Sequence, residues 1–217
     1  MKLKSVMMML LIVAASALMT SRVISQDAGE KDPKHPQDGP PDMAAMMEWM
    51  KLTQPGEHHQ DLNQFVGQWN MTTKMWMIPG APPSVSKGTV KYKMIMDGRF
   101  LSEEVSAEID MGPMGKQPFE GFGLTGYDKV RSLYTSCWVA NQDTQMMISK
   151  GTRHPETGVY TFYGERDDPR TNIYGGLVKW RIRFSDKDHF VSEMFNLAAG
   201  EDERIMEIAY TRAKSSS

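Results

Sequence analysis

The feature that most constrains this chain is a series of short segments in which apolar and polar side chains alternate. In one such segment, apolar Val90, Tyr92 and Met94 alternate with lysines. A period of two is typical of β-strands that bury one face. We expect about ten strands, which begin at Trp69 and then cover residues 89–96, 99–109, 119–127, 133–140, 145–152, 159–166, 174–184, 190–197 and 204–212.

The segments between these strands predict how the strands connect. They are short and rich in turn-forming residues, and Asp97-Gly98 is a strong signal for a hairpin. Because no crossover helix separates the strands, we expect one antiparallel sheet that closes on itself or packs on a second sheet. Closure removes exposed strand edges, so an all-β, up-and-down barrel is favoured over a sandwich.

One or two short helices are expected before the barrel. Met43, Met46, Met47 and Met50 recur at helical spacing, and Pro55-Gly56 is suited to end that helix. Asp42 is its expected cap. We interpret the methionines as an apolar face packed over the barrel mouth, in preference to a Cu(I) site of thioether ligands. A second helix is expected over 57–66, with Leu62, Phe65 and Val66 on one face.

The N-terminus resembles a secretory signal peptide. Lys2 and Lys4 precede an apolar run over 7–17, and small residues follow, with cleavage expected before Gln26 or after Ala17. The run is shorter than the roughly 20 residues of a spanning helix, which argues against an uncleaved anchor. We therefore expect a signal peptide over 1–25, a polar, proline-rich tether over 26–41, and a single periplasmic or secreted domain over 42–217.

The charge of the mature chain excludes some classes of partner. Without Lys2, Lys4 and Arg22, the 25 basic side chains become 22 against 27 acidic ones, a net charge of about −5. Nucleic-acid binding is not expected of such a chain, and neither is membrane association after signal cleavage. Cys137 is the one cysteine, so an intrachain disulfide is impossible. Oligomeric state is left open.

Several short motifs in a fixed order carry a resemblance to a known family. They are Met46-Met47-Glu48-Trp49-Met50, Pro55-Gly56-Glu57-His58, Val66-Gly67-Gln68-Trp69, Met75-Trp76-Met77, Gly98-Arg99-Phe100-Leu101, Gly121 to Asp128 and Tyr210-Thr211-Arg212. Together they resemble the domain of unknown function 1579 family. The resemblance spans about 43–212 and implies a calycin-like barrel, the architecture of lipocalins, with no established activity.

The resemblance also implies a structural pair and bears on haem. Calycin barrels have a Gly-x-Trp on the first strand and an Arg near the last, whose guanidinium stacks on the indole; Gly67, Trp69 and Arg212 stand at these places. One calycin relative, nitrobindin, holds haem through a His near its C-terminus. Here the last histidine is His189, so the axial ligand is missing and no cofactor is expected.

Two further motifs suggest ligands that we do not expect. Gly121, Gly123 and Gly126 match the dinucleotide pattern G-x-G-x-x-G, but that site needs a helix after the glycines and a strand follows instead. We expect a bend or a close backbone approach. His58 and Asp61 have the spacing of two metal ligands on a helix, but a solvated helix face is the preferred interpretation and no metal is expected.

The interior of the barrel is the candidate binding site. Glu103 shares a strand face with Leu101 and Val105, and Arg99 is its expected partner. We expect a small, mostly apolar ligand whose polar end is fixed by Glu103 or Arg99, within a lining of Tyr92, Trp138, Trp180 and Tyr210. An enzyme with acid–base chemistry at Glu103, and a filled barrel that acts through its surface, remain alternatives.

Overall fold

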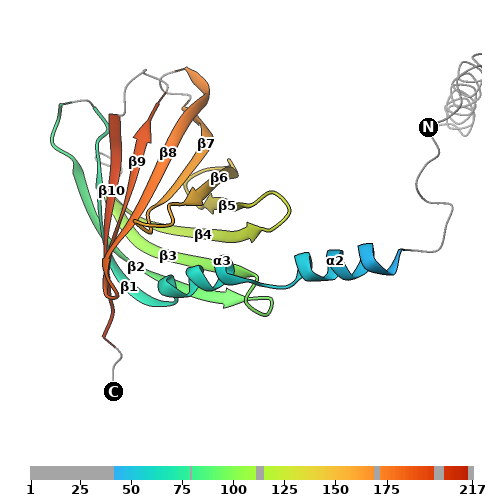
Figure 1. Cartoon of the computed structure of the whole chain (residues 1–217). Coiled ribbons are helices and arrows are strands. Elements are labelled where there is room, and N and C mark those ends of the chain that lie inside the picture. The colour runs from blue at the N-terminus through green and yellow to red at the C-terminus, as the bar shows by residue number, and fades with distance from the viewer. Residues whose placement is uncertain (1–41, 79, 111–114, 169–171, 198–202, 215–217) are drawn as a thin grey trace, which may run out of the picture. The chain divides into compact units, whose positions relative to one another are not determined.

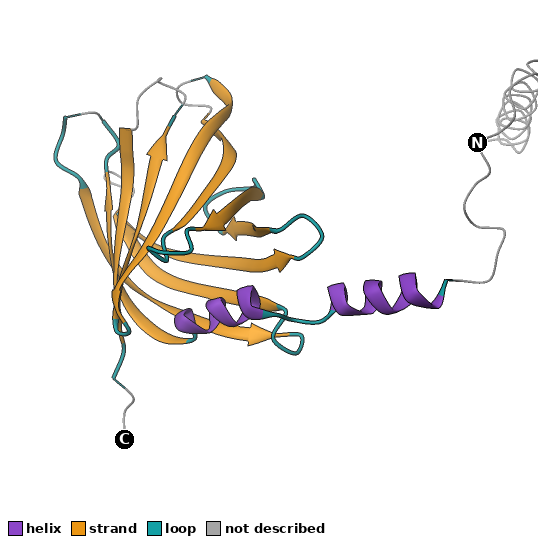
Figure 2. Ribbon diagram, in the orientation of Figure 1, coloured by secondary structure: helices purple, strands orange, loops and turns teal. Residues whose placement is uncertain are grey.

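A computed structural model describes residues 42–78, 80–110, 115–168, 172–197 and 203–214. The signal peptide and tether expected over 1–41 lie outside the described residues. Ten strands make up most of the structure (Figures 1 and 2). They are β1 (Gly67–Met75), β2 (Ser84–Ile95), β3 (Phe100–Asp110), β4 (Lys116–Asp128), β5 (Leu133–Ala140), β6 (Met147–Arg153), β7 (Tyr160–Asp168), β8 (Ile173–Asp186), β9 (His189–Asn196) and β10 (Glu203–Arg212).

The strands form the closed antiparallel barrel that the alternation predicts. Each strand pairs with its neighbours in sequence, and β1 closes the sheet against β10. The closing register runs from Trp69 opposite Arg212 to Met75 opposite Met206. Because each strand is antiparallel to the next one in sequence, the topology is up-and-down and the expected fold is confirmed.

One end of the barrel is sealed by the segment that precedes β1. Helix α3 (Glu57–Gln60) continues into the 3₁₀ helix η1 (Asp61–Phe65), where Leu62 and Phe65 are buried. The Phe65 ring lies 4.9–5.6 Å, between ring centroids, from the rings of Tyr92, Tyr160, Phe184 and Phe190. Val66 was expected on the same helical face but is exposed, because η1 ends before it and its backbone is extended.

Side chains on the inner face of β1 become more exposed with distance from η1. Along β1, the exposed fraction rises from 0% at Trp69 through 7% at Met71 to 38% at Met75, all on one face of the strand. The Trp69 indole nitrogen donates to the Phe65 carbonyl at 2.7 Å, which places this residue at the sealed end. The other end of the barrel is therefore the one at which inward-facing side chains reach solvent.

Helix α2 (Met43–Thr53) forms where the methionine spacing predicts it. The Asp42 carboxylate accepts a hydrogen bond of 3.0 Å from the Ala44 N–H, as expected of a cap. All of its residues are exposed, so the burial that we expected for its methionines is not present. The chain divides into two compact units, 1–47 and 48–217, and the barrel lies in the second. Among the described residues, none of the helices has the length and apolar character needed to span a membrane.

Candidate functional site

Glu103 lies on the inner face of the barrel, in the first half of β3. The register places it opposite Tyr92 on β2 and opposite Gly123 on β4. The Tyr92 hydroxyl donates a hydrogen bond of 2.8 Å to Glu103 Oε1. Tyr92 and Tyr210 are buried, whereas Glu103 keeps part of its surface accessible. The carboxyl thus adjoins the packed aromatic core, and Val105, the next inward residue along β3, is buried as well.

Burial controls the protonation of this carboxyl. Loss of hydration raises the pKa of Glu103 to about 7, and the hydrogen bond from Tyr92 opposes that rise. Burial, together with the nearby Glu103 charge, raises the pKa values of Tyr92 and Tyr210 well above their usual range. Both phenols are therefore neutral donors at neutral pH, while Glu103 exchanges its proton near neutrality.

The three glycines of the G-x-G-x-x-G pattern lie within β4 and make room for large neighbours. A Cβ on Gly121 would lie 2.4 Å from the Trp138 ring, and one on Gly126 would lie 2.5 Å from the Phe100 ring. A Cβ on Gly123 would lie 2.8 Å from Glu103 Oε2 and 3.3 Å from Trp138 Cε3. As expected, no helix follows the glycines: a turn leads from β4 into β5. Because Gly121 and Gly123 have no side chains, Trp138 and Glu103 can lie close together against the backbone of β4.

Five of the six residues expected to line a ligand site share the inner face. Trp138 pairs with Gly123, Trp180 with Phe162, and Tyr210 with Met71 in the strand register. The Tyr210 ring also stacks on Phe190, with 4.0 Å between ring centroids. Trp138 and Trp180 are only partly buried although they face inward. These five residues are Tyr92, Glu103, Trp138, Trp180 and Tyr210.

The expected pairing of Arg99 with Glu103 is wrong. Arg99 lies in the turn between β2 and β3, where its Nε donates to the Thr53 carbonyl at 3.2 Å and its Nη1 to the Met96 carbonyl at 3.2 Å. Met96, Asp97 and Gly98 all have positive φ, so the chain leaves the strand alternation before it reaches Arg99. Face assignment by alternate residues does not hold in such a turn.

The partner that the structure gives Glu103, Tyr92, was not predicted, although a sequence signal for it exists. A two-residue Asp97-Gly98 turn fixes a hairpin register in which Tyr92 lies opposite Glu103, and the structure has that register. Extending the turn prediction along both strands would have identified the tyrosine as the partner of the carboxyl.

A second inner-face cluster closes the sealed end and was not anticipated. The Tyr134 hydroxyl donates to the His58 carbonyl at 3.0 Å, and the Tyr160 hydroxyl donates to the Asp61 carbonyl at 3.2 Å. Arg153 Nη1 lies 3.7 Å from Asp61 Oδ1. Both tyrosines are 1% exposed, so these contacts fasten α3 and η1 to the barrel wall.

The Arg212 guanidinium stacks on Trp69 at the same end, with its central carbon 4.0 Å from the ring centroid. Its nitrogens donate to the carbonyls of Val66, Gln64 and Lys187 at 2.7–3.0 Å. Gly67 has a φ of +126°, and a Cβ there would lie 2.9 Å from Arg212 Nη1. Gly67, Trp69 and Arg212 therefore join β1, β10 and η1 at the sealed end of the barrel.

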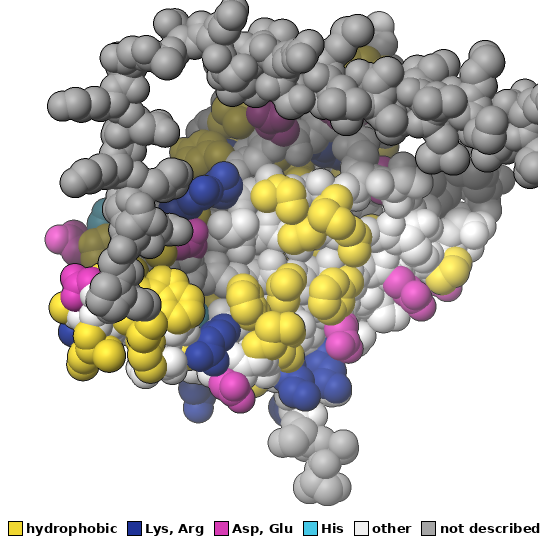
Figure 3. All heavy atoms as spheres, turned by 90° about the vertical axis from the view of Figure 1, so that its right-hand side faces the viewer, with side chains coloured by type: hydrophobic (Ala, Val, Ile, Leu, Met, Phe, Trp, Pro, Cys, Tyr) yellow, Lys and Arg dark blue, Asp and Glu magenta, His cyan; other side chains and the backbone are white. Residues whose placement is uncertain are grey.

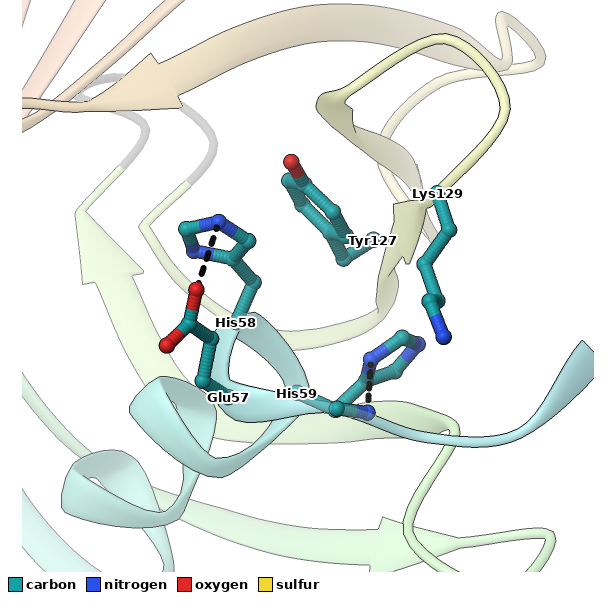
Figure 4. A pocket seen from close by; sticks show the side chains of 6 residues that line it. Glu57, His58, His59, Tyr127 and Lys129 are labelled. Atoms are coloured by element: carbon teal, nitrogen blue, oxygen red, sulfur yellow. Dashed lines mark hydrogen bonds and ion pairs between the residues drawn. The ribbon is translucent and has the colours of Figure 1, made fainter. Parts of the chain in front are cut away.

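A surface pocket of about 240 Å³ lies beside α3 (Figure 4). The His59 Nδ1 accepts a hydrogen bond of 3.1 Å from the Gly56 N–H, and burial, with the positive charge of Lys129 next, lowers the pKa of His59. The His58 ring packs on the Tyr127 ring, and His58 Nδ1 lies 3.5 Å from Asp61 Oδ2. In the described part of the chain, no three His, Cys, Asp or Glu side chains gather as metal ligands.

Hydrophobic side chains also gather on one outer face of the molecule (Figure 3). On the outside of β6, β7 and β8, a shallow depression of about 410 Å³ has Lys150 and Glu165 among its lining residues. The apolar residues that line it are all exposed: Met146, Ile148, Tyr163 and Leu177. This surface is separate from the barrel interior.

Comparison with known proteins places the chain in a group without an assigned activity. The family model "Protein of unknown function (DUF1579)" matches residues 54–212. The crystal structure of Rv2717c from M. tuberculosis matches with a TM-score of 0.53 and 14% identity, over 74% of this chain and 100% of that chain, which shows a shared fold. A redesigned β-barrel matches at 12% identity and a TM-score of 0.36, over 71% of this chain and 96% of that one. No curated protein matches the sequence with significance.

Proposed function

The chain belongs to the DUF1579 family of proteins of unknown function, and we propose that its barrel binds a small, mostly apolar ligand in the interior. The observation that carries this proposal is an ionisable carboxyl among inward-facing aromatic residues that remain partly exposed. Glu103 is the polar group, Trp138 is the apolar surface beside it, and Trp180 faces inward from β8. Ligand sites in proteins combine a mostly apolar lining with a few placed polar groups.

The two ends of the barrel differ in packing, and this difference supports entry of a ligand from one end only. Leu62 and Phe65 fill the end beneath η1, so a ligand enters from the end where Met75 and Met206 lie. Glu103 lies between these ends and meets the polar group of a ligand that has entered from the accessible side. Tyr92 holds the carboxyl in place through its hydrogen bond.

Native mass spectrometry on the protein isolated from its own host tests this proposal. We expect an additional mass that remains with the folded chain and is lost on denaturation. A bare polypeptide mass, together with no stabilisation by any member of an apolar ligand library, would contradict the proposal.

Acid–base catalysis at Glu103 is the second candidate function. The specific observation in its favour is a carboxyl whose pKa is raised to about 7, since efficient general acids and bases have pKa values near the working pH. Turnover separates the two candidates. An enzyme loses product formation in Glu103→Gln while it retains binding, whereas a binding protein shows saturation without product.

The proposed location of the protein is the periplasm or the cell exterior. Support comes from the basic and apolar N-terminal segment over 1–25. N-terminal sequencing of the mature protein is expected to read from Gln26, or from the residue after Ala17. An intact Met1 in protein recovered from the cytoplasm would contradict this proposal.

A further inference from the structure

The charges of the inner face constrain the chemistry of the ligand. Between the two ends of the barrel, Glu103 is the one charged side chain on the inner face of the described strands. At the sealed end, Arg153 is paired with Asp61 and Arg212 lies on Trp69. At the accessible end, Arg166 and Glu203 belong to the inner-face registers and have opposite charges. The middle of the interior therefore has acidic character.

Among the described residues, one of the two oxygens of Glu103 receives a hydrogen bond and the other does not. Within the described residues, Tyr92 donates the hydrogen bond that this carboxyl receives, and it does so at Oε1. Oε2 lies against the Gly123 backbone, and the edge of the Trp138 ring lies against the same backbone. An ionised carboxylate in such surroundings is destabilised unless a positive charge or further donors reach it.

The rings around the carboxyl do not oppose a cation. Tyr92, Tyr210 and Trp138 all face inward near the carboxyl, and none of them carries a positive charge that would repel one. A ligand carboxylate would instead meet Glu103 with a like charge and would have to take up a proton. An ammonium group supplies the positive charge and the hydrogen-bond donors that the carboxylate lacks.

We propose that the ligand of this barrel is an apolar amine, whose ammonium group binds Glu103 Oε2 and whose hydrocarbon part lies against Trp138 and Trp180. This inference rests on the proposed binding of an apolar ligand in the interior. It narrows the ligand class from small apolar molecules in general to those with a protonated nitrogen, and it excludes fatty acids.

Three probes of equal chain length test the inference: n-octylammonium, n-octanol and n-octanoate, titrated by calorimetry into the mature protein. At about pH 8 both Glu103 and the alkylammonium are charged. We expect octylammonium to bind about tenfold or more tightly than the other two, as a charge-assisted hydrogen bond allows. In Glu103→Gln we expect that preference to disappear, while the affinity for octanol is unchanged.

Glu104→Gln is the matched control. Glu104 is the next residue along β3, but it is exposed on the outer face, so the same loss of charge leaves the interior unaltered. We expect this variant to retain the preference for octylammonium. Circular dichroism of both variants verifies that the barrel is intact.

The remaining outcomes separate the two proposals. If octanoate binds as tightly as octylammonium, or if all three probes bind equally, the inferred charge preference is wrong and binding of an apolar ligand still stands. A preference for octylammonium that persists in Glu103→Gln also overturns the inference, because Glu103 then does not recognise the amine. If none of the three probes binds, both the preference and the proposed function are contradicted.

Discussion

Tyr92 and Glu103 face each other across the β2–β3 hairpin, with the tyrosine hydroxyl 2.8 Å from a carboxylate oxygen. Among the described residues, no positively charged side chain is paired with this carboxylate, and a buried charge without such a partner is costly. The hydroxyl supplies one hydrogen bond, and burial raises the pKa of the carboxyl to about 7. The pair therefore links the ionisation of the interior to pH near neutrality.

The first prediction concerns stability as a function of pH. Because the pKa of Glu103 is raised in the folded state from 4.5 to about 7, the folded protein holds this proton more tightly than the unfolded chain. The stability from this group is complete below about pH 4.5 and is lost as pH rises toward 7, by up to about 3 kcal/mol. In urea unfolding, the difference between the protein and Glu103→Gln is expected to follow that window, whereas Glu104→Gln shows no such difference.

The second prediction separates the tyrosine hydroxyl from its ring. Tyr92→Phe removes the hydrogen bond that favours the ionised carboxylate while the aromatic ring remains. We expect the pKa of Glu103 to rise further above 7. Carbon-detected NMR titration of labelled glutamate side chains measures the shift directly. An unchanged or lowered pKa in this variant would show that the hydroxyl does not stabilise the charge.

The third prediction concerns closure of the barrel. Trp69→Ala removes a fully buried indole together with its contact with Arg212, and we expect a loss of about 3–5 kcal/mol in the free energy of unfolding. Gly67→Ala is expected to be destabilising as well, because its φ of +126° and the nearby guanidinium both disfavour a Cβ. A melting temperature equal to that of the parent protein in Trp69→Ala contradicts this account.

The fourth prediction concerns the glycines of β4. Gly121→Ala places a methyl group on the Trp138 ring, and we expect a cost of about 1–3 kcal/mol with a change in tryptophan emission as the ring moves. In a Trp138→Leu background the same substitution is expected to cost much less, since the smaller side chain leaves room. Equal costs in the two backgrounds would mean that the ring is not what requires glycine.

The barrel could be predicted from the sequence because alternation is a direct consequence of strand geometry. Tyr92, Trp138, Trp180 and Tyr210 face inward as alternation indicates. The lack of crossover helices predicts an antiparallel sheet, and the removal of exposed edges favours its closure. Alternation failed for Arg99, which lies in a turn whose residues have positive φ. The rule assigns faces only where the backbone is extended.

Helical spacing identified apolar faces but not what covers them. Leu62 and Phe65 are buried as expected, yet Val66 falls one residue beyond η1 and is exposed. The methionines of α2 have the same spacing and are all exposed. Periodicity reports which side chains share a face, whereas burial depends on a partner surface that is distant in the sequence.

The contact between Arg212 and Val66 joins positions that are 146 residues apart, so the barrel has its seam at the two ends of its strand order. Local hairpins can form as the chain emerges during synthesis, but the seam requires the last strand. Contacts of such long sequence separation slow folding. A chain that stops before β10 leaves β1 and β9 as open edges, which are templates for aggregation. The edges of β1 and β9 are therefore both paired only after β10 has been synthesised.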